Sequence, residues 1–208
     1  RLQEPESALA DYEAAIRSWP EMANAFLHRG QLRELRGDRA GARADFEETV
    51  RLDPDDAVAR VNRGRFRLDD GDGKGAIEDL TIAIECDPLF AAAYNLRGIA
   101  LGQSGDARSA VPDFDAAIRL QPDNAAYRSN RAGTRLEIGD VDGALAGFTD
   151  AIRVDPDYLQ AYYYRGMILA DRGEKDLAIR DYEKVLSLAP PGWRNRSDVE
   201  GRLERLRR

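Results

Sequence analysis

The chain has 208 residues, of which 33% are charged and 43% are hydrophobic, and its formal net charge is -7 at pH 7. This balance indicates a soluble, folded protein and excludes an intrinsically disordered one. No apolar run approaches the roughly 20 residues of a membrane-spanning helix, and the opening Arg-Leu-Gln-Glu-Pro lacks the apolar core of a signal peptide. We therefore expect no membrane contact in this part of the protein.

Cys86 is the only cysteine in the sequence, and His28 is the only histidine. A single cysteine excludes an intrachain disulfide and a cysteine-rich metal site, and it favours a reducing compartment such as the cytoplasm. A reduced periplasmic protein would have the same composition. One histidine also excludes a histidine-based metal cluster, so we expect no metal and no other cofactor.

The first predicted element is a single helix within residues 1–22, which carries Ala8, Tyr12 and Ala15 and closes at Pro20. The closing proline then returns every 34 residues along the chain: Pro20, Pro54, Pro88, Pro122, Pro156 and Pro190. A proline disfavours helical geometry in the residue before it, so four residues are expected to close helices. They are Asp53, Asp87, Gln121 and Asp155.

A second series with the same period consists of glycines, each followed by an acidic residue: Gly37, Gly71, Gly105, Gly139 and Gly173. This pair of residue types stops one helix and starts the next. Each 34-residue unit therefore contains two helices. Internal repeats of 20 to 50 residues are the signature of a stacked array rather than of a globule with one central core.

Four further series describe the packing between helices. Small residues recur in the first helix of each unit at Gly30, Gly64, Gly98, Ala132 and Gly166, and in the second helix at Ala42, Ala76, Ala110, Ala144 and Ala178. Large apolar residues follow on the same face of the second helix at Phe46, Leu80, Phe114, Phe148 and Tyr182, then at Val50, Ile84, Ile118, Ile152 and Leu186. These positions predict close helix crossings and a running core.

The pattern resembles the tetratricopeptide repeat family, which has a small residue in the first helix, an alanine and an aromatic residue in the second, and a closing proline. The resemblance implies an all-α solenoid, a right-handed superhelix of antiparallel helix pairs. We predict five complete repeats, at residues 23–56, 57–90, 91–124, 125–158 and 159–192. Residues 1–22 then form the second helix of an incomplete repeat, which leads us to expect that the natural protein continues upstream.

Residues 193–208 are predicted to form a terminal capping helix. Ser197-Asp198-Val199-Glu200 has the spacing of a capping box, and Leu203 and Leu206 follow among charged residues. Such a helix covers the apolar face of the last repeat. Its excess of arginine could also contact nucleic acid, but a solvated cap is the simpler interpretation, and we expect no nucleic-acid partner.

Arginine immediately precedes the small residue of every first helix, at Arg29, Arg63, Arg97, Arg131 and Arg165. Acids recur in the second helices at Asp11, Asp45, Asp79, Asp113 and Asp181, whereas Gly147 interrupts this series. The arginines could bind phosphate, but pairs with the aspartates explain both series together. We predict guanidinium–carboxylate contacts that weaken around Gly147.

The resemblance places ligand recognition on the inner face of the first helices, in a concave groove. The candidate peptide-binding residues of the first three repeats are Asn24, Leu27, His28, Gln31, Val61, Asn62, Arg65, Asn95, Leu96 and Ile99. The last two repeats offer Ser129, Asn130, Gly133, Gln160, Tyr163, Tyr164 and Met167. Asparagine can hold a peptide backbone through both donor and acceptor atoms, and tyrosine and methionine give adaptable apolar contact.

The main functional prediction is therefore a scaffold that binds a protein or peptide partner in this groove, and not an enzyme. Two alternatives remain open: a structural spacer or self-assembly element, which could associate through the exposed N-terminal half repeat, and the regulatory arm of a larger enzyme. Some family members bind the carboxyl terminus of heat-shock chaperones through lysine, asparagine and arginine. Here Asn24, Val58, Ala92 and Ala126 stand where lysines are expected.

Several local signals have simpler structural interpretations. Gly71-Asp72-Gly73-Lys74-Gly75 lacks the serine or threonine of a phosphate loop and is expected to be an interhelix turn. Cys86 aligns with Leu52, Leu120, Val154 and Leu188, so we expect a small core residue rather than a nucleophile. Pro112 lies early in a second helix, and we expect that helix to start late, near Ser109 or Ala110.

Overall fold

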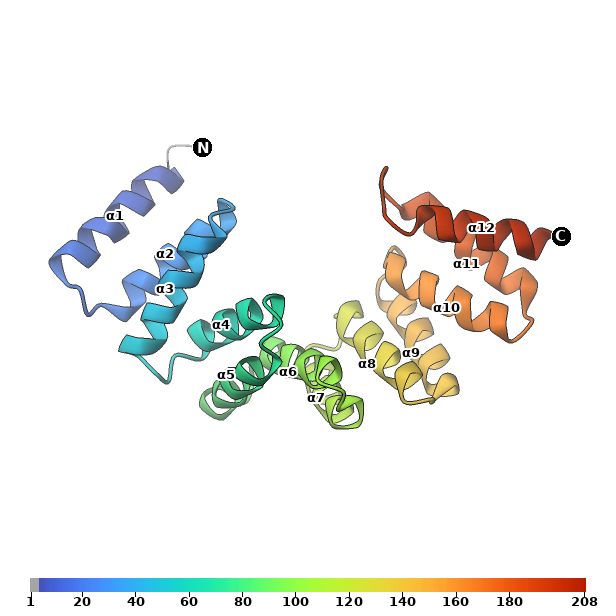
Figure 1. Ribbon diagram of the computed structural model, residues 1–208, viewed down its shortest axis with the longest axis horizontal. Coiled ribbons are helices and arrows are strands. Elements are labelled where there is room, and N and C mark those ends of the chain that lie inside the picture. The colour runs from blue at the N-terminus through green and yellow to red at the C-terminus, as the bar shows by residue number, and fades with distance from the viewer. Residues whose placement is uncertain (1–3) are drawn as a thin grey trace. The chain divides into compact units, whose positions relative to one another are not determined.

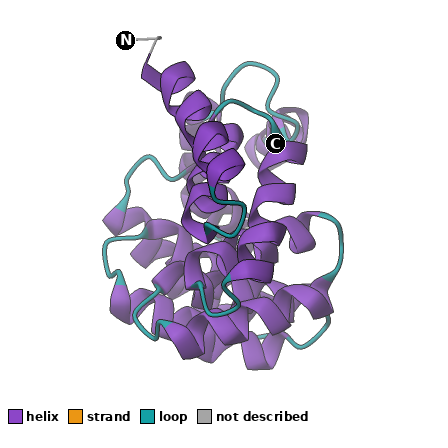
Figure 2. Ribbon diagram, turned by 90° about the vertical axis from the view of Figure 1, so that its left-hand side faces the viewer, coloured by secondary structure: helices purple, strands orange, loops and turns teal. Residues whose placement is uncertain are grey.

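The computed structural model describes residues 4–208, in which all regular secondary structure is helical and no strand occurs (Figure 2). The chain divides into two compact units, Arg1–Ser104 and Gly105–Arg208. Of residues 1–22, which are predicted to contain a single helix, residues 1–3 lie outside the described part.

Unit 1 contains α1 (Glu4–Ser18), α2 (Ala23–Leu35), α3 (Arg39–Leu52), α4 (Ala57–Asp69), α5 (Gly73–Cys86) and α6 (Ala91–Gln103). Unit 2 contains α7 (Ala107–Leu120), α8 (Ala125–Glu137), α9 (Val141–Val154), α10 (Leu159–Asp171), α11 (Lys175–Leu188) and α12 (Arg196–Arg207). Neighbours in the chain pack side by side within each unit, as α2 does with α3, α4 with α5, α8 with α9 and α10 with α11 (Figure 1). The predicted class, an all-α helical-repeat solenoid, is confirmed. The repeat boundaries stay a prediction, and the division between the units falls inside the predicted repeat of residues 91–124.

The helix ends follow the predicted proline and glycine series. The residues before four of the prolines, Asp53, Asp87, Gln121 and Asp155, cap their helices in non-helical geometry, as predicted. The turn glycines Gly37, Gly71, Gly105, Gly139 and Gly173 have φ between 77° and 89°. A left-handed φ favours glycine because other residues bring Cβ too close to the backbone. Asp38, Asp72, Asp106 and Asp140 then cap the following helices, each accepting a hydrogen bond from the backbone N–H three residues later.

The large apolar series forms the core of each unit. Phe46 and Leu80 in unit 1 are fully buried, as are Phe148 and Tyr182 in unit 2. Close helix crossings explain the small residues opposite them. A Cβ added to Gly30 would lie 2.9 Å from Phe46 Cε1, and one added to Gly64 would lie 3.0 Å from Leu80 Cγ.

At the α8–α9 crossing the smallest residue lies on the second helix rather than on the first. Ala132 replaces the glycine of α8, and Gly147 replaces the aspartate of α9. A Cβ on Gly147 would lie only 2.8 Å from the Cβ of Ala132. The extra methyl group on one helix is therefore accommodated by the missing side chain on the other.

The C-terminal helix α12 covers the end of the last helix pair. Val199 and Leu203 are buried in one cluster with Leu169, Tyr182 and Val185. The proposed capping box is wrong, because α12 begins at Arg196 and Ser197 lies inside its first turn. Asn195 is the N-cap, and its side chain makes no capping bond within the described chain.

Two further expectations are wrong. The helix that contains Pro112 starts at Ala107, because Asp106 caps it in the same way as aspartates cap α3, α5 and α9. Pro112 lies in its second turn at an exposed position, where water can solvate the carbonyl group that loses its helical donor. Cys86 is exposed rather than buried, since it is the last residue of α5 and is shorter than the leucines at the equivalent positions.

Candidate functional site

Arginine–aspartate pairs tie the first and second helices together in both units. In unit 1, Arg29 Nε and Nη2 donate to Asp45 at 3.0 and 2.6 Å, and Arg63 makes the same forked contact with Asp79 at 2.8 and 2.6 Å. In unit 2, Arg165 binds both oxygens of Asp181 at 2.7 Å. The predicted pairing is confirmed for these three arginines.

Burial makes these pairs structural rather than ligand-binding. Side-chain hydrogen bonds to Asp45, Asp79 and Asp181 raise the pKa of Arg29, Arg63 and Arg165 further above the ordinary arginine value. The three aspartates are buried, and a buried carboxylate requires such partners because removal from water is costly. These arginines are therefore committed to internal carboxylates.

The pattern weakens at Gly147, as predicted. Arg131 has no carboxylate at that position and donates instead from Nη1 to Asp115 of α7, at 2.5 Å. Its Nε atom is buried and finds no partner among the described residues. Arg128 Nη1, one helical turn earlier on α8, is in the same state.

The candidate residues of unit 1 lie on α2, α4 and α6. Asn24 and His28 are exposed, while Gln31, Asn62, Arg65, Asn95, Leu96 and Ile99 are partly buried. Contacts connect α2 with α4, since Arg65 forms a salt bridge with Glu34 at 2.6 Å and a hydrogen bond with Asn62 at 3.2 Å. His28 Nδ1 lies 3.2 Å from Gln31 Oε1, and the His28 ring stacks on Tyr12 of α1. The first helices thus present a mixed polar surface whose side chains are partly held in place.

The candidate residues of unit 2 lie on α8 and α10, which contact one another. Gln160 and Tyr164 are exposed, and Asn130, Gly133, Tyr163 and Met167 are partly buried. Tyr163 donates its hydroxyl group to Asp198 of α12 at 3.2 Å. Burial raises the pKa of this tyrosine, and so does the nearby Asp198 carboxylate.

Three candidate side chains are buried and do not reach the surface. Leu27 and Val61 belong to the hydrophobic clusters of unit 1. Ser129 is buried in unit 2. These three side chains therefore contribute to helix packing and are not available to a ligand.

An aromatic cluster on α10 was only partly foreseen from the sequence. Tyr164 is 40% exposed and stacks on Phe148, with ring centroids 5.5 Å apart. Tyr163 meets Tyr164 edge-on at 5.2 Å and meets Trp193 edge-on at 5.8 Å. Trp193 was missed because it lies in the turn before α12 and outside the periodic columns. Its position after Pro190-Pro191-Gly192 was the only available signal.

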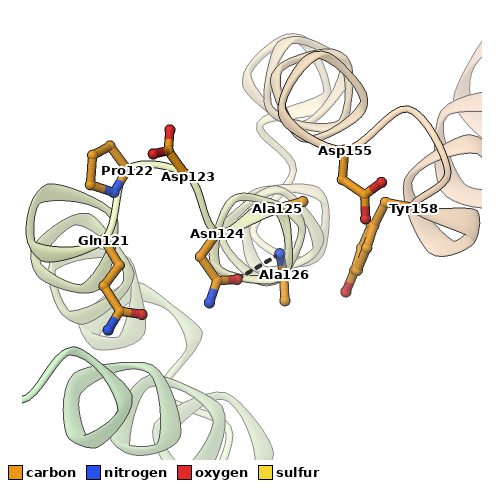
Figure 3. A pocket seen from close by; sticks show the side chains of 8 residues that line it. All are labelled: Gln121, Pro122, Asp123, Asn124, Ala125, Ala126, Asp155 and Tyr158. Atoms are coloured by element: carbon orange, nitrogen blue, oxygen red, sulfur yellow. Dashed lines mark hydrogen bonds between the residues drawn. The ribbon is translucent and has the colours of Figure 1, made fainter.

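A separate pocket of about 520 Å³ lies at the turns of unit 2 and was not predicted (Figure 3). Gln121 and Pro122 line one side, and Asp155 and Tyr158 line the other, with the start of α8 between them. Asn124 caps α8 by accepting from Ala126 and Tyr127. The acids Asp123 and Asp155 give this pocket no evident anion site, and its residues contain no nucleophile paired with a base.

Within residues 4–208, no cluster of histidine, cysteine, aspartate or glutamate has a metal-binding arrangement. None of the helices described is both long and apolar enough to cross a bilayer.

Comparisons with known proteins agree with this architecture. The sequence profile described as tetratricopeptide repeat matches residues 1–57, 35–91, 61–124, 95–147 and 132–192. The comparison with curated protein sequences finds no match.

Solved structures with the same fold include YrrB, a tetratricopeptide repeat protein with an unusual peptide-binding site. It is 20% identical over 87% of this chain and 93% of its own, with a TM-score of 0.68. TTC0263, a thermophilic tetratricopeptide repeat protein of Thermus thermophilus, is 21% identical over 88% of this chain and 99% of its own, with a TM-score of 0.71. The Cut9–Hcn1 complex of the APC/C reaches a TM-score of 0.78 at 15% identity, over 99% of this chain and 40% of the matched chain.

The chain is a helical-repeat protein, and it belongs to the tetratricopeptide repeat family. Membership in this family supports a general role as a protein-interaction scaffold. The structural likenesses, all below 25% identity, establish the fold alone.

Proposed function

We propose that the protein binds an extended peptide segment of a partner protein on the first-helix surface of unit 2, with aromatic contacts from α10. The observation that carries this proposal is the aromatic cluster on α10. Tyr164 leaves 40% of its surface exposed although it stacks on the buried ring of Phe148. A large aromatic side chain that is both rigid and exposed is typical of an anchor for a partner.

The chemistry around Tyr164 suits an apolar side chain within a peptide. Met167 follows three residues later on α10 and is partly exposed. Methionine adapts to irregular apolar shapes, whereas the tyrosine and tryptophan rings hold fixed positions. In unit 1, by contrast, the amide groups of Asn62 and Gln31 already bond within the chain, to Val58 and Arg65 and to His28. The peptide-binding site named for YrrB supports a ligand of this kind for the shared fold.

A peptide array tests the proposal directly. Peptides that the full chain binds should lose roughly tenfold or more in affinity to Tyr164→Ala, because truncation of an aromatic anchor commonly costs more than 1 kcal/mol. Asn62→Ala should weaken binding less. The matched control is Leu89→Ala, which truncates a side chain 76% exposed at a turn and away from the first-helix surface. Equal binding by wild type, Tyr164→Ala and Met167→Ala would contradict the proposal.

Self-association is the second candidate, and exposed apolar side chains near α1 and α2 favour it. Trp19 is 66% exposed, Met22 46% and Leu35 86%. Single exposed apolar residues are common, but Trp19 and Met22 lie close together in the turn between α1 and α2, where one partner surface could cover both. Light scattering decides this point, since a dimer that forms through this surface should revert to a monomer in Trp19→Glu. A constant monomer mass over a concentration series would remove this candidate.

A further inference from the structure

The fourth helix pair of the chain, α8–α9, contains three arginines without the carboxylate that their counterparts bind. In α4–α5, Arg60, Arg63 and Arg67 all contact Asp79, at 2.9, 2.6 and 3.0 Å. Two repeat lengths later the same positions are Arg128, Arg131 and Arg135, and the position of Asp79 is Gly147. The cationic half of the arrangement is present, and its internal anion is missing.

Unsatisfied donors mark the place where the anion is missing. Arg128 Nη1 and Arg131 Nε are both buried, and neither has a hydrogen-bond partner in the described part of the chain. The Arg131 contact with Asp115 uses another atom, Nη1. Arg135 lies 3.8 Å from Asp140, a distance too long for a hydrogen bond. Buried guanidinium donors that lack an acceptor favour the binding of an anion.

The cluster is reachable from solvent. The side chain of Arg131 is 18% exposed and that of Arg135 is 29% exposed. One repeat later, the equivalent place is a surface cavity of about 410 Å³, lined by Arg165, Leu169, Asp181 and other residues of α9, α10 and α11. In that cavity Asp181 of α11 accepts the hydrogen bonds of Arg165. In α8–α9 the methyl group of Ala132 fills the space beside Gly147, so a ligand reaches the guanidinium groups from their exposed side.

We propose that Arg128, Arg131 and Arg135 form a binding site for the carboxylate group of a ligand, which takes the part that Asp79 plays between Arg60, Arg63 and Arg67. The planar guanidinium groups match a carboxylate through paired N–H donors. This site goes beyond the proposed peptide surface, because it is formed by the arginines and not by Asn130 or Gly133 of the same helix. Its test is therefore independent of peptide binding.

The Nε–H signals of the arginines in ¹H–¹⁵N NMR spectra report the site directly. Sodium acetate serves as a free small carboxylate, and the capped peptide acetyl-Ala-Glu-Ala-amide serves as an acidic side chain of a partner. The glutamine version of the peptide and sodium chloride at matched ionic strength are controls. We expect saturable shifts of the Arg128 and Arg131 signals with acetate. Shifts with the glutamate peptide assign the site to a partner's side chain as well, and shifts with acetate alone assign it to small acids.

Variants of the full chain separate a specific site from general screening. Ala132→Gly with Gly147→Asp rebuilds the internal pair of α4–α5 and should weaken acetate binding at least about tenfold, since the new aspartate competes for the same donors. Arg128→Gln adds no bulk and should also weaken binding. Arg60→Gln, at the filled counterpart, should leave acetate binding unchanged.

Circular dichroism confirms that each variant folds. Shifts no larger than those with chloride, or acetate binding that is the same in wild type and both α8–α9 variants, would mean that only water satisfies these donors and would overturn the proposal.

Discussion

The helix pairs α4–α5 and α8–α9 carry arginines at the same three positions, but only α4–α5 has an aspartate that binds all three. In α4–α5, Gly64 lets the helices approach, and Asp79 neutralises the arginines from within. In α8–α9, Ala132 occupies the space that a Cβ at residue 147 would need, and Gly147 supplies no carboxylate. Two differences, alanine for glycine on the first helix and glycine for aspartate on the second, thus leave the arginines of α8–α9 without an internal carboxylate. In a repeat protein each pair contacts mainly its neighbours, so such local changes are tolerated.

The largest expected effect is at the closed cluster. Asp79→Ala leaves Arg60, Arg63 and Arg67 without their shared acceptor, and breaking a buried ion pair from one side typically costs about 3–5 kcal/mol. Denaturant unfolding of the variant should show this loss. Asp157→Ala is the matched control, because its salt bridge to Lys184 is exposed and such pairs contribute about 0–1 kcal/mol. Losses of similar size in the two variants would contradict the central role of Asp79.

A pair of arginine substitutions compares the two clusters directly. Arg60→Ala removes a hydrogen bond to the buried Asp79, and such charged bonds contribute about 1.5–3 kcal/mol. Arg128→Ala instead removes a donor that has no acceptor, so the free energy of unfolding should change by less than about 0.5 kcal/mol or rise. The two variants are measured in the same denaturant series. A larger loss for Arg128→Ala than for Arg60→Ala would show that Arg128 has a stabilising partner.

The packing exchange predicts a coupled pair of mutations. Gly147→Ala would place a Cβ 2.8 Å from the Cβ of Ala132, which is too close for packed carbon atoms, so the helices must shift at an expected cost of about 1–3 kcal/mol. Ala132→Gly should remove most of this cost, because it restores the space found beside Gly64. A double-mutant cycle measures the coupling free energy. Additive effects of the two substitutions would mean that the methyl groups do not compete for one space.

Periodic features could be predicted from the sequence, because each is repeated and each has a local cause. Proline and glycine set the helix ends through backbone geometry, and the large residues of the core are in phase with them. The burial of individual side chains on the first helices depends on contacts between helices, which the residue type at a repeated position does not specify. Leu27 and Val61 lie in columns expected at the surface, but neighbouring helices bury them.

Departures from the columns were harder to interpret. The Gly147 interruption was visible in the sequence, but the orphaned donors of Arg128 and Arg131 follow from three-dimensional geometry. Trp193 reaches Tyr163 across a turn with no periodic signal. Pro112 shows a similar limit, because the Asp106 cap and an exposed position outweighed its helix-breaking tendency.

The smallest expected effect is a pH dependence that only the α4–α5 side should show. Arg43 of α3 forms a salt bridge with Asp70 at the end of α4. Its hydrogen bond is the main cause that lowers the pKa of the Asp70 carboxyl group. The equivalent residue at the end of α8 is Ile138, which does not titrate. Because the folded pKa is lowered, the pair stabilises the protein above the unfolded aspartate value of about 3.9, and this stabilisation is lost as the pH falls through the folded pKa. The contribution is small because the pair is exposed.

Carboxyl ¹³C NMR titration should give an Asp70 midpoint below the ordinary aspartate value in wild type and near it in Arg43→Gln. Identical midpoints in the two proteins would show that Arg43 does not hold Asp70 in solution.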